Sequence, residues 1–240
     1  MENTVRRPLF FEFFGLPGCG KSTVSHAIAM LLRENGYSVK EPSYRIDHQK
    51  RIIKRLLKFA IVCWWYLFHH KEYCSIRNIV RLNDYMGLEE LLQISNIIQK
   101  VRIYNNKVNS HIFIWDQGLV QAAISLSIKG AVSAGENYNN LKLLIRRDVM
   151  MVPIYMPVAI DVALKRMSER PTNDSRVEEL VVHEQKVALL KRYQEGIDSI
   201  GSLFAGGLDS IVVNDIVDLD EKVNVVYNEM MKTVKENVFV

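Results

Sequence analysis

The sequence predicts a three-layer α/β domain, in which helices cover both faces of a central parallel sheet of about five strands. Two observations carry this prediction. Short apolar or β-branched runs alternate with longer stretches that place apolar residues at helical spacing, which is the pattern of strand–helix–strand crossovers. In addition, a glycine-rich turn joins the first apolar run to a helical segment.

The predicted strands are runs without the polar alternation of a half-exposed sheet, which indicates strands buried on both faces. They are Leu9–Phe14, Tyr37–Glu41, His111–Asp116, Met150–Met156 and Ser210–Asn214. About 70 residues separate the second run from the third, and their helical spacing predicts a helical insertion over about residues 45–108, beside the sheet. The chain has no repeat and no linker-like stretch, so residues 1–240 are predicted to form a single domain.

Composition narrows the class of protein. The 240 residues are 48% hydrophobic and 24% charged, as in ordinary globular proteins, and the net charge of +4 is too mild to indicate a nucleic-acid partner. Cys19, Cys63 and Cys74 have neither disulfide-type nor zinc-type spacing, which favours a reducing compartment. Glu12 interrupts the apolar N-terminal run, and the longest nearly apolar run is only 13 residues long. These features predict a cytoplasmic protein rather than a secreted or multi-pass membrane protein.

The glycine-rich turn is the strongest motif. The residues Gly15-Leu16-Pro17-Gly18-Cys19-Gly20-Lys21-Ser22, followed by Thr23, fit the G-x-x-x-x-G-K-[ST] phosphate-binding loop without a departure. The glycines let backbone N–H groups approach phosphates, Lys21 is expected to reach the β- and γ-phosphates, and the Ser22 hydroxyl is expected to bind Mg²⁺. The predicted nucleotide-binding residues are therefore Gly15, Gly18, Cys19, Gly20, Lys21, Ser22 and Thr23. The motif predicts binding of a nucleoside triphosphate.

A single carboxylate, Asp116, ends the third predicted strand. The carboxyl ends of parallel strands open into the crevice where such sheets bind ligands. Asp116 is therefore predicted to bind Mg²⁺ or its water together with Ser22, or to act as a base. The alternative is an ordinary turn or helix-capping aspartate. No guanine-reading N-K-x-D motif is present, which argues against a GTPase.

Arginines gather after the fourth predicted strand. Arg166 and Arg170 lie four residues apart, so they share one face of a helix that Pro171 ends, and Arg176 follows on a polar loop. Such a segment can close over a triphosphate and exclude water, which predicts a lid over about residues 166–178. The alternative is a solvated basic helix end.

The order of these motifs resembles the thymidylate kinase and deoxynucleoside kinase group of P-loop kinases. The resemblance rests on the phosphate loop, the Glu41-Pro42 pair after the second strand, Asp116, and the segment from Leu164 to Glu178. It covers most of the chain apart from the middle helices. It implies ATP and Mg²⁺ as cofactors, and it implies that Glu41 contacts or deprotonates the phosphoryl acceptor. The alternative is that Glu41 merely ends a strand before a proline turn.

The sequence also departs from that group. Gln117 follows Asp116 where the group has an arginine, and the arginine-bearing helix that holds the acceptor's monophosphate in thymidylate kinases has no clear counterpart near residues 94–97. Gln121 does match a glutamine in the corresponding helix of the group. The resemblance therefore indicates the class of reaction, and it leaves the acceptor open.

Residues 45–71 are basic at first and then apolar through Trp64-Trp65-Tyr66-Leu67-Phe68. Three interpretations stay open: a wall of the acceptor site, a contact of residues 50–68 with an anionic membrane surface or a partner protein, and a packed helix with a solvated basic side. No nucleic-acid motif accompanies this segment.

The sequence thus predicts an ATP- and Mg²⁺-dependent kinase with a small-molecule acceptor, most readily a nucleoside or nucleotide, with a sugar or another hydroxyl compound second. The competing class is a regulatory NTPase that a partner stimulates, and a homodimer is left open. The predicted catalytic residues are Lys21, Glu41, Asp116, Arg166, Arg170 and Arg176.

Overall fold

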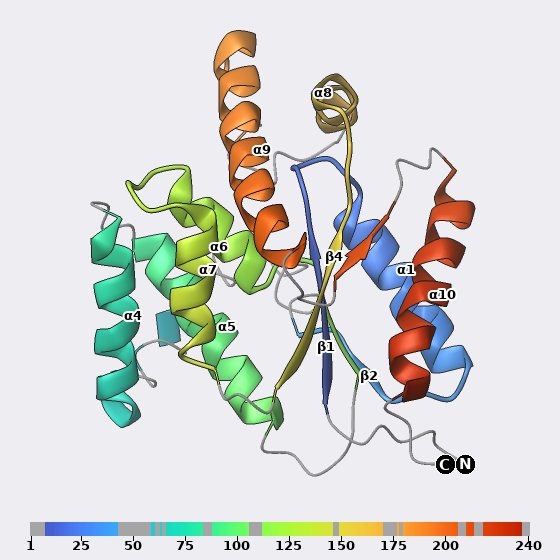
Figure 1. The fold of residues 1–240 in the computed structure, drawn as a ribbon, viewed down its shortest axis with the longest axis horizontal. Helices are drawn as coiled ribbons and strands as arrows, with labels where there is room; N and C mark the ends of the chain where they lie inside the picture. Colours follow the sequence, from blue (N-terminus) through green and yellow to red (C-terminus); the bar gives the residue numbers. More distant parts are fainter. Residues whose placement is uncertain are drawn as a thin grey trace.

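The computed structural model describes residues 8–42, 59–60, 63, 66–83, 88–105, 112–145, 149–169, 177, 180–205, 210–213 and 218–236. Within them, five parallel strands form one sheet in the order β2-β3-β1-β4-β5 (Figure 1). The strands are β1 (Leu9–Phe14), β2 (Val39–Lys40), β3 (Ile112–Trp115), β4 (Met150–Tyr155) and β5 (Ile211–Val212). The prediction of a parallel five-stranded sheet is confirmed.

The two edge strands are shorter than the sequence predicts. Among the described residues, β2 pairs with β3 through Val39 opposite Ile112 and Lys40 opposite Phe113, while Tyr37 forms an isolated bridge and Glu41 follows the strand. β5 likewise pairs only with the last two residues of β4. An edge strand has a neighbour on one side only, so its ladder extends only as far as that neighbour pairs with it, whatever its local propensity.

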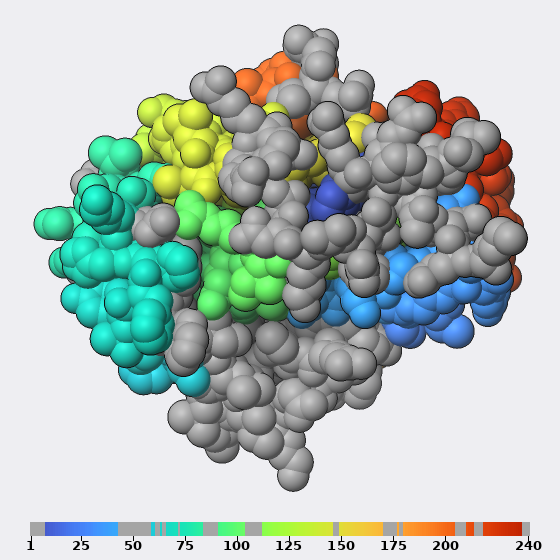
Figure 2. Space-filling model, turned by 90° about the horizontal axis from the view of Figure 1, so that it is seen from below, coloured from blue at the N-terminus to red at the C-terminus, as the bar shows by residue number. Residues whose placement is uncertain are grey.

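Helices form a layer on each face of the sheet (Figure 1). In the space-filling view from below, the blue and red segments lie on the right and the teal, green and yellow segments lie on the left (Figure 2). One layer holds α1 (Lys21–Glu34) and α10 (Leu219–Glu236), and the other holds α6 (Leu119–Ser127), α7 (Ala134–Lys142) and α9 (His183–Ala205). Of the helical insertion predicted over about residues 45–108, the structure describes α4 (His70–Leu82) and α5 (Leu88–Asn105), which pack beside α6 and α7. α8 (Ile160–Ser168) follows β4 beyond the carboxyl ends of the strands. This arrangement confirms the three-layer prediction.

The core is built around β1, whose six residues are all buried. Phe10 stacks on Phe113 of β3, with 4.6 Å between ring centroids, and Phe14 meets Phe204 of α9 edge-on at 5.9 Å. Alternate residues of a strand share a face, so Glu12 points with Phe10 and Phe14 towards the layer of α6, α7 and α9. A carboxyl group therefore lies inside an otherwise apolar stack.

A reciprocal amide pair attaches the insertion to the α7 layer. Asn83, which follows α4, donates to Asn137 Oδ1 of α7 at 2.9 Å, and Asn137 donates back to Asn83 Oδ1 at 3.0 Å. Both side chains are fully buried, and each amide also donates to a nearby carbonyl. A Cβ at Gly130 would overlap Asn83, so the glycine makes room for the pair.

Two predicted features lie largely outside the described residues. They are the arginines of the lid beyond residue 169 and most of the 50–68 segment, including Trp64 and Trp65. Of that segment's described residues, Phe59, Tyr66, Leu67 and Phe68 are exposed. In the part of the chain that the structure describes, no helix combines the length and apolarity needed to cross a bilayer. The membrane or partner contact stays a prediction, and so does the single-domain organisation.

Candidate active site

The phosphate loop occupies residues 15–20, between the end of β1 and the start of α1. Gly18 has a φ of 86°, and a Cβ there would lie 2.7 Å from the carbonyl oxygen of Ala163, so the loop needs glycine both for its backbone angle and for its contact with α8. Gly20, at the N-cap of α1, has a φ of 91°, and no side chain caps the helix. The amide groups of the first turn are therefore available to an anion.

Lys21 lies back over the loop. Its Nζ donates to the carbonyl oxygens of Gly15 and Leu16, at 2.9 Å each, and lies 3.5 Å from Cys19 Sγ. Cys19 itself is buried, while Thr23 is exposed on the first turn of α1. The loop thus carries a cation at its centre, where phosphate charge would be neutralised.

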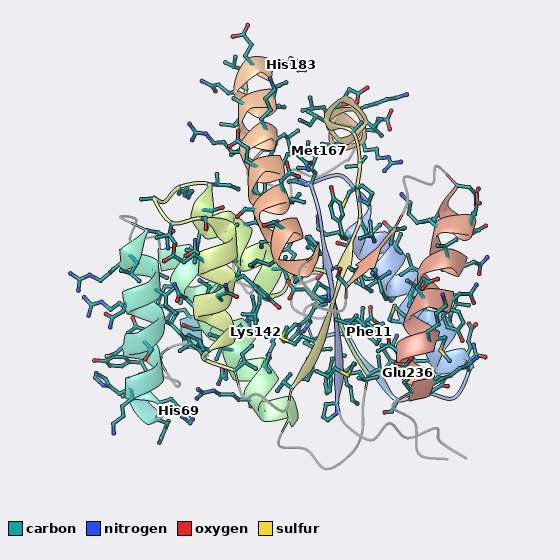
Figure 3. All side chains as sticks on the ribbon, viewed as in Figure 1. Phe11, His69, Lys142, Met167, His183 and Glu236 are labelled. Atoms are coloured by element: carbon teal, nitrogen blue, oxygen red, sulfur yellow. The ribbon has the colours of Figure 1, made fainter. Side chains whose placement is uncertain are left out.

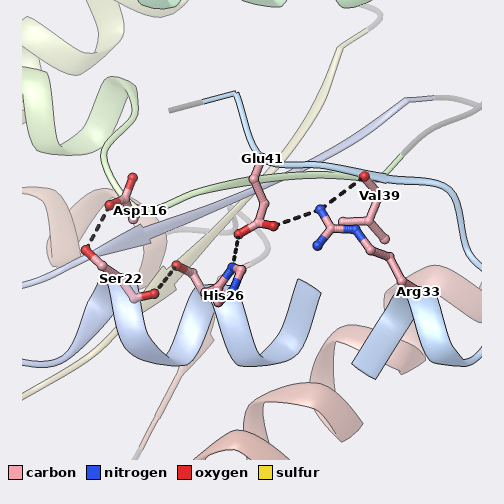
Figure 4. A network of polar contacts seen from close by, with 7 residues as sticks. Ser22, His26, Arg33, Val39, Glu41 and Asp116 are labelled. Carbon is pink, nitrogen blue, oxygen red and sulfur yellow. Dashed lines mark hydrogen bonds and ion pairs between the residues drawn. The ribbon is translucent and has the colours of Figure 1, made fainter. Parts of the chain in front are cut away.

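The two residues predicted to bind Mg²⁺ are in contact. Ser22 Oγ donates to Asp116 Oδ2 at 2.9 Å, across the gap between α1 and the end of β3 (Figure 4). A hydroxyl and a carboxylate are hard oxygen ligands, and Mg²⁺ in proteins is commonly held by one or two carboxylates together with substrate phosphates and water. The donor set therefore fits Mg²⁺. Among the described residues, no group of three His, Cys, Asp or Glu side chains could hold a metal by itself.

Glu41 follows β2 and is held by α1. Its Oε1 lies 2.9 Å from His26 Nδ1 and its Oε2 lies 2.7 Å from an Arg33 amino group (Figure 4). Arg33 also donates to the carbonyl oxygen of Val39 at 3.4 Å. His26 and Arg33 are seven residues apart, which is two helical turns, so both face β2. The Glu41 side chain is only 9% exposed, and each of its oxygens already has a partner.

The helical insertion reaches the same end of the sheet. Lys100 Nζ of α5 donates to the carbonyl oxygen of Pro42 at 2.8 Å. On α5 and the neighbouring α6, three buried side-chain oxygens have no hydrogen-bond partner among the described residues: Ser95 Oγ, Asn96 Oδ1 and Gln121 Oε1. Buried polar atoms in native proteins nearly always have a partner, so these three atoms carry unused hydrogen-bonding capacity.

Glu12 is the carboxyl group inside the core. Its Oε1 accepts from the amides of Val120, at 2.6 Å, and Gln121, at 3.2 Å, in the first turn of α6, while its Oε2 is buried without a partner in the described structure. Burial raises the pKa of Glu12 from 4.5 to about 7, against the lowering effect of the α6 amides. Burial, and then the charge of Glu12, raises the pKa of the nearby Tyr138.

Of the predicted lid, the structure describes Arg166. It lies in the last turn of α8, the helix whose Ala163 and Met167 approach Gly18 of the loop. Met167 is labelled in Figure 3. Arg170 and Arg176 lie outside the described residues. Gln117 follows Asp116 at the position where the thymidylate kinase and deoxynucleoside kinase group has an arginine, and its side chain is exposed.

No protein-family model and no curated protein sequence matches the chain. Solved structures do match. One is a deoxyadenosine kinase from M. mycoides with the products dCMP and dCDP bound, at 18% identity and a TM-score of 0.52, over 93% of this chain and 99% of that one. The structure of deoxyadenosine kinase from M. mycoides with dATP bound matches at 16% identity and a TM-score of 0.53, over 92% and 98%. The chain has the fold of a P-loop deoxynucleoside kinase. At this identity the likeness shows the fold alone.

Within this kinase fold, sequence reasoning missed Glu12 and the two partners of Glu41. A lone carboxylate inside the run Leu9–Phe14 was a usable signal, because burying an unpaired charge is strongly unfavourable. The seven-residue spacing of His26 and Arg33 on one face of α1 was a weaker signal. Neither pattern predicts which group the side chain contacts, because those contacts form only when α6 packs against β1 and β2 lies beside α1.

Proposed function

We propose that the chain is an ATP- and Mg²⁺-dependent kinase that transfers the γ-phosphoryl group of ATP to a nucleoside or a nucleotide. The contact between Ser22 and Asp116 carries this proposal, because it brings a hydroxyl and a carboxylate together beside a complete phosphate loop. The fold shared with a deoxyadenosine kinase supports the proposal.

On the donor side, the loop amides and Lys21 would bind the β- and γ-phosphates. Lys21 would exchange its contacts with the Gly15 and Leu16 carbonyl oxygens for contacts with phosphate oxygens. Ser22 and Asp116 would hold Mg²⁺, which when bound neutralises charge on the phosphates. Phosphoryl transfer needs positioning and charge stabilisation more than a covalent nucleophile, and this donor set supplies both.

On the acceptor side, Glu41 is the proposed base. As the acceptor oxygen bonds to the γ-phosphorus, the bond from that phosphorus to the β,γ-bridging oxygen breaks, and the hydroxyl proton passes to the Glu41 carboxylate. His26 and Arg33 would orient the carboxylate, and each carboxylate oxygen keeps a second lone pair for the acceptor. A phosphate acceptor would need little help from a base, and Glu41 would then contact it rather than deprotonate it.

A nucleobase would offer N–H donors to the acceptor site. A sugar offers hydroxyl donors instead, and it remains the second acceptor class. Arg166, Arg170 and Arg176 would close over the phosphates and exclude water, as proposed for the lid.

The deciding experiment incubates the purified chain with ATP and Mg²⁺, together with a panel of nucleosides, nucleoside monophosphates and sugars, and analyses the products by mass spectrometry. Lys21→Ala protein is the matched control. A phosphorylated nucleoside or nucleotide supports the proposal, and a phosphorylated sugar moves the assignment to a sugar kinase. ATP hydrolysis that no small molecule stimulates, and that only a protein or membrane raises, would replace the kinase by a regulatory NTPase.

A further inference from the structure

The turn that carries Asp116 is held from two sides by the unit of β1, the phosphate loop and α1. On one side, Ser22 Oγ donates to Asp116 Oδ2 at 2.9 Å. On the other side, Glu12 of β1 accepts from Val120 N at 2.6 Å and Gln121 N at 3.2 Å. Asp116 lies between Trp115, the last residue of β3, and the start of α6 at Leu119, so the strand end and the helix end together determine where the Asp116 carboxylate lies.

Glu12 acts as the cap that α6 lacks locally. The N-cap residue is Gly118, and no side chain of the turn itself caps the helix. Gly118 has φ −121° and ψ −144°. A Cβ there would overlap the carboxyl carbon of Glu12 and lie 2.6 Å from its Oε2. Gly118 and Glu12 therefore fit each other.

Helix stability is a poor explanation for this carboxyl group. In most helices a serine or aspartate at the N-cap accepts from these amides, with no carboxyl group needed on a neighbouring strand. Glu12 instead buries an oxygen, Oε2, that has no partner among the described residues, which destabilises a fold. Groups that a protein keeps against its own stability concentrate at functional sites.

We propose that Glu12 is a positioning residue for phosphoryl transfer: by capping α6 from inside the sheet, it fixes the turn of residues 116–118 and so holds the Asp116 carboxylate beside Ser22. The proposal rests on the metal-binding role proposed for Asp116. Glu12 lies under the turn and acts on the reaction only through it.

The test is a double-mutant cycle of Glu12→Ala and Gly118→Ala, with Glu12→Gln as the conservative variant. The readouts are the Mg²⁺ concentration that gives half the maximal rate, the kcat, and the Mg²⁺ dependence of binding of a fluorescent ATP analogue. Val234→Ala, a truncation at a fully buried position near the end of α10, is the control for loss of stability away from the turn.

Glu12→Ala is expected to raise the half-saturating Mg²⁺ concentration or lower kcat by about 10- to 100-fold, the range seen when a group that orients a metal ligand is removed. Glu12→Gln keeps an acceptor oxygen for the two amides and is expected to stay close to the wild type. Gly118→Ala should resemble Glu12→Ala, and the double variant should be no worse than Gly118→Ala, because the overlapping carboxyl group is gone.

Unchanged Mg²⁺ dependence and kcat in Glu12→Ala, with only a lower melting temperature as in Val234→Ala, would overturn the proposal. The proposal would also be overturned if the fold-losses of Glu12→Ala and Gly118→Ala multiplied in the double variant, because the two substitutions would then act independently. If the wild-type chain transfers no phosphate, the proposed function fails, and the Mg²⁺ dependence of analogue binding still measures the effect of Glu12 on the turn.

Discussion

Replacing Glu12 by glutamine should change how the free energy of unfolding depends on pH. In the folded protein the pKa of Glu12 is about 7, against an ordinary value of 4.5, because burial disfavours the charged form. Below pH 4.5 the carboxyl is protonated in both the folded and the unfolded chain, and it contributes no pH dependence. Between about 4.5 and 7 the unfolded chain gives up the proton first, so stability falls as pH rises. Above pH 7 the carboxyl is ionised in both states, and the free energy of unfolding is reduced by the full cost of the buried charge.

The size of this penalty follows from the same values. Each pKa unit corresponds to about 1.4 kcal/mol, so the rise from 4.5 to about 7 amounts to about 3 kcal/mol. Glutamine does not titrate. Relative to Glu12→Gln, the wild type should therefore lose about 3 kcal/mol of stability between pH 4.5 and pH 7.5, and little on either side of that window.

Urea unfolding of both proteins at half-unit pH steps measures this difference, because other titrating groups contribute equally to both curves and cancel. A wild-type curve that stays parallel to the Glu12→Gln curve from pH 4 to pH 8 would refute the reasoning. It would mean that the Glu12 carboxyl is solvated or paired in the folded protein.

The remaining predictions concern the donor, the acceptor and the lid. Lys21→Ala should reduce turnover by at least about 100-fold, as expected when a preorganised charge on the transferred group is lost, and steady-state kinetics measures this. Glu41→Gln should lower kcat strongly for a hydroxyl acceptor and only mildly for a phosphate acceptor, while the KM for ATP stays nearly constant. Arg166→Ala should lower kcat by about 10- to 1000-fold, which corresponds to about 1.4–4 kcal/mol, with little change in melting temperature.

Each of these predictions has its own control. A folded Lys21→Ala protein with wild-type turnover would contradict the donor site. Arg33→Met removes the ion pair with Glu41 and keeps the carboxylate, so it separates lost orientation from a lost base. Equal kinetics of Glu41→Gln and Arg33→Met would argue that Glu41 only ties β2 to α1. For Arg166, a lower melting temperature with normal kinetics would favour the solvated helix end.

The parts of the fold that local pattern specifies could be predicted from the sequence. The central strands and the phosphate loop depend on runs of neighbouring residues, and Asp116 follows from the rule that parallel strands open at their carboxyl ends. The prediction failed at the edge strands, because the length of β2 depends on how far β3 pairs with it. Neither the single domain nor the roles of the site residues follow from the fold, so these stay predictions.

The environment of the acidic groups could not be predicted. Glu12 caps a helix that begins more than 100 residues later in the chain, and no spacing rule connects two such segments. Glu41 was predicted as a carboxylate facing an acceptor, whereas α1 supplies partners to both of its oxygens. In both cases the local sequence places a charge, and tertiary packing decides what that charge touches.

The amide pair between Asn83 and Asn137 limits how this chain can diverge. Replacing one asparagine leaves the other with an unmet buried amide, which typically destabilises a protein by about 1–3 kcal/mol, whereas replacing both with apolar residues of similar shape can be nearly neutral. Substitutions at the two positions should therefore be correlated among descendants of this chain. A chimera that imports α4 and its following residue from a relative should fold well only if it also imports the matching position of α7.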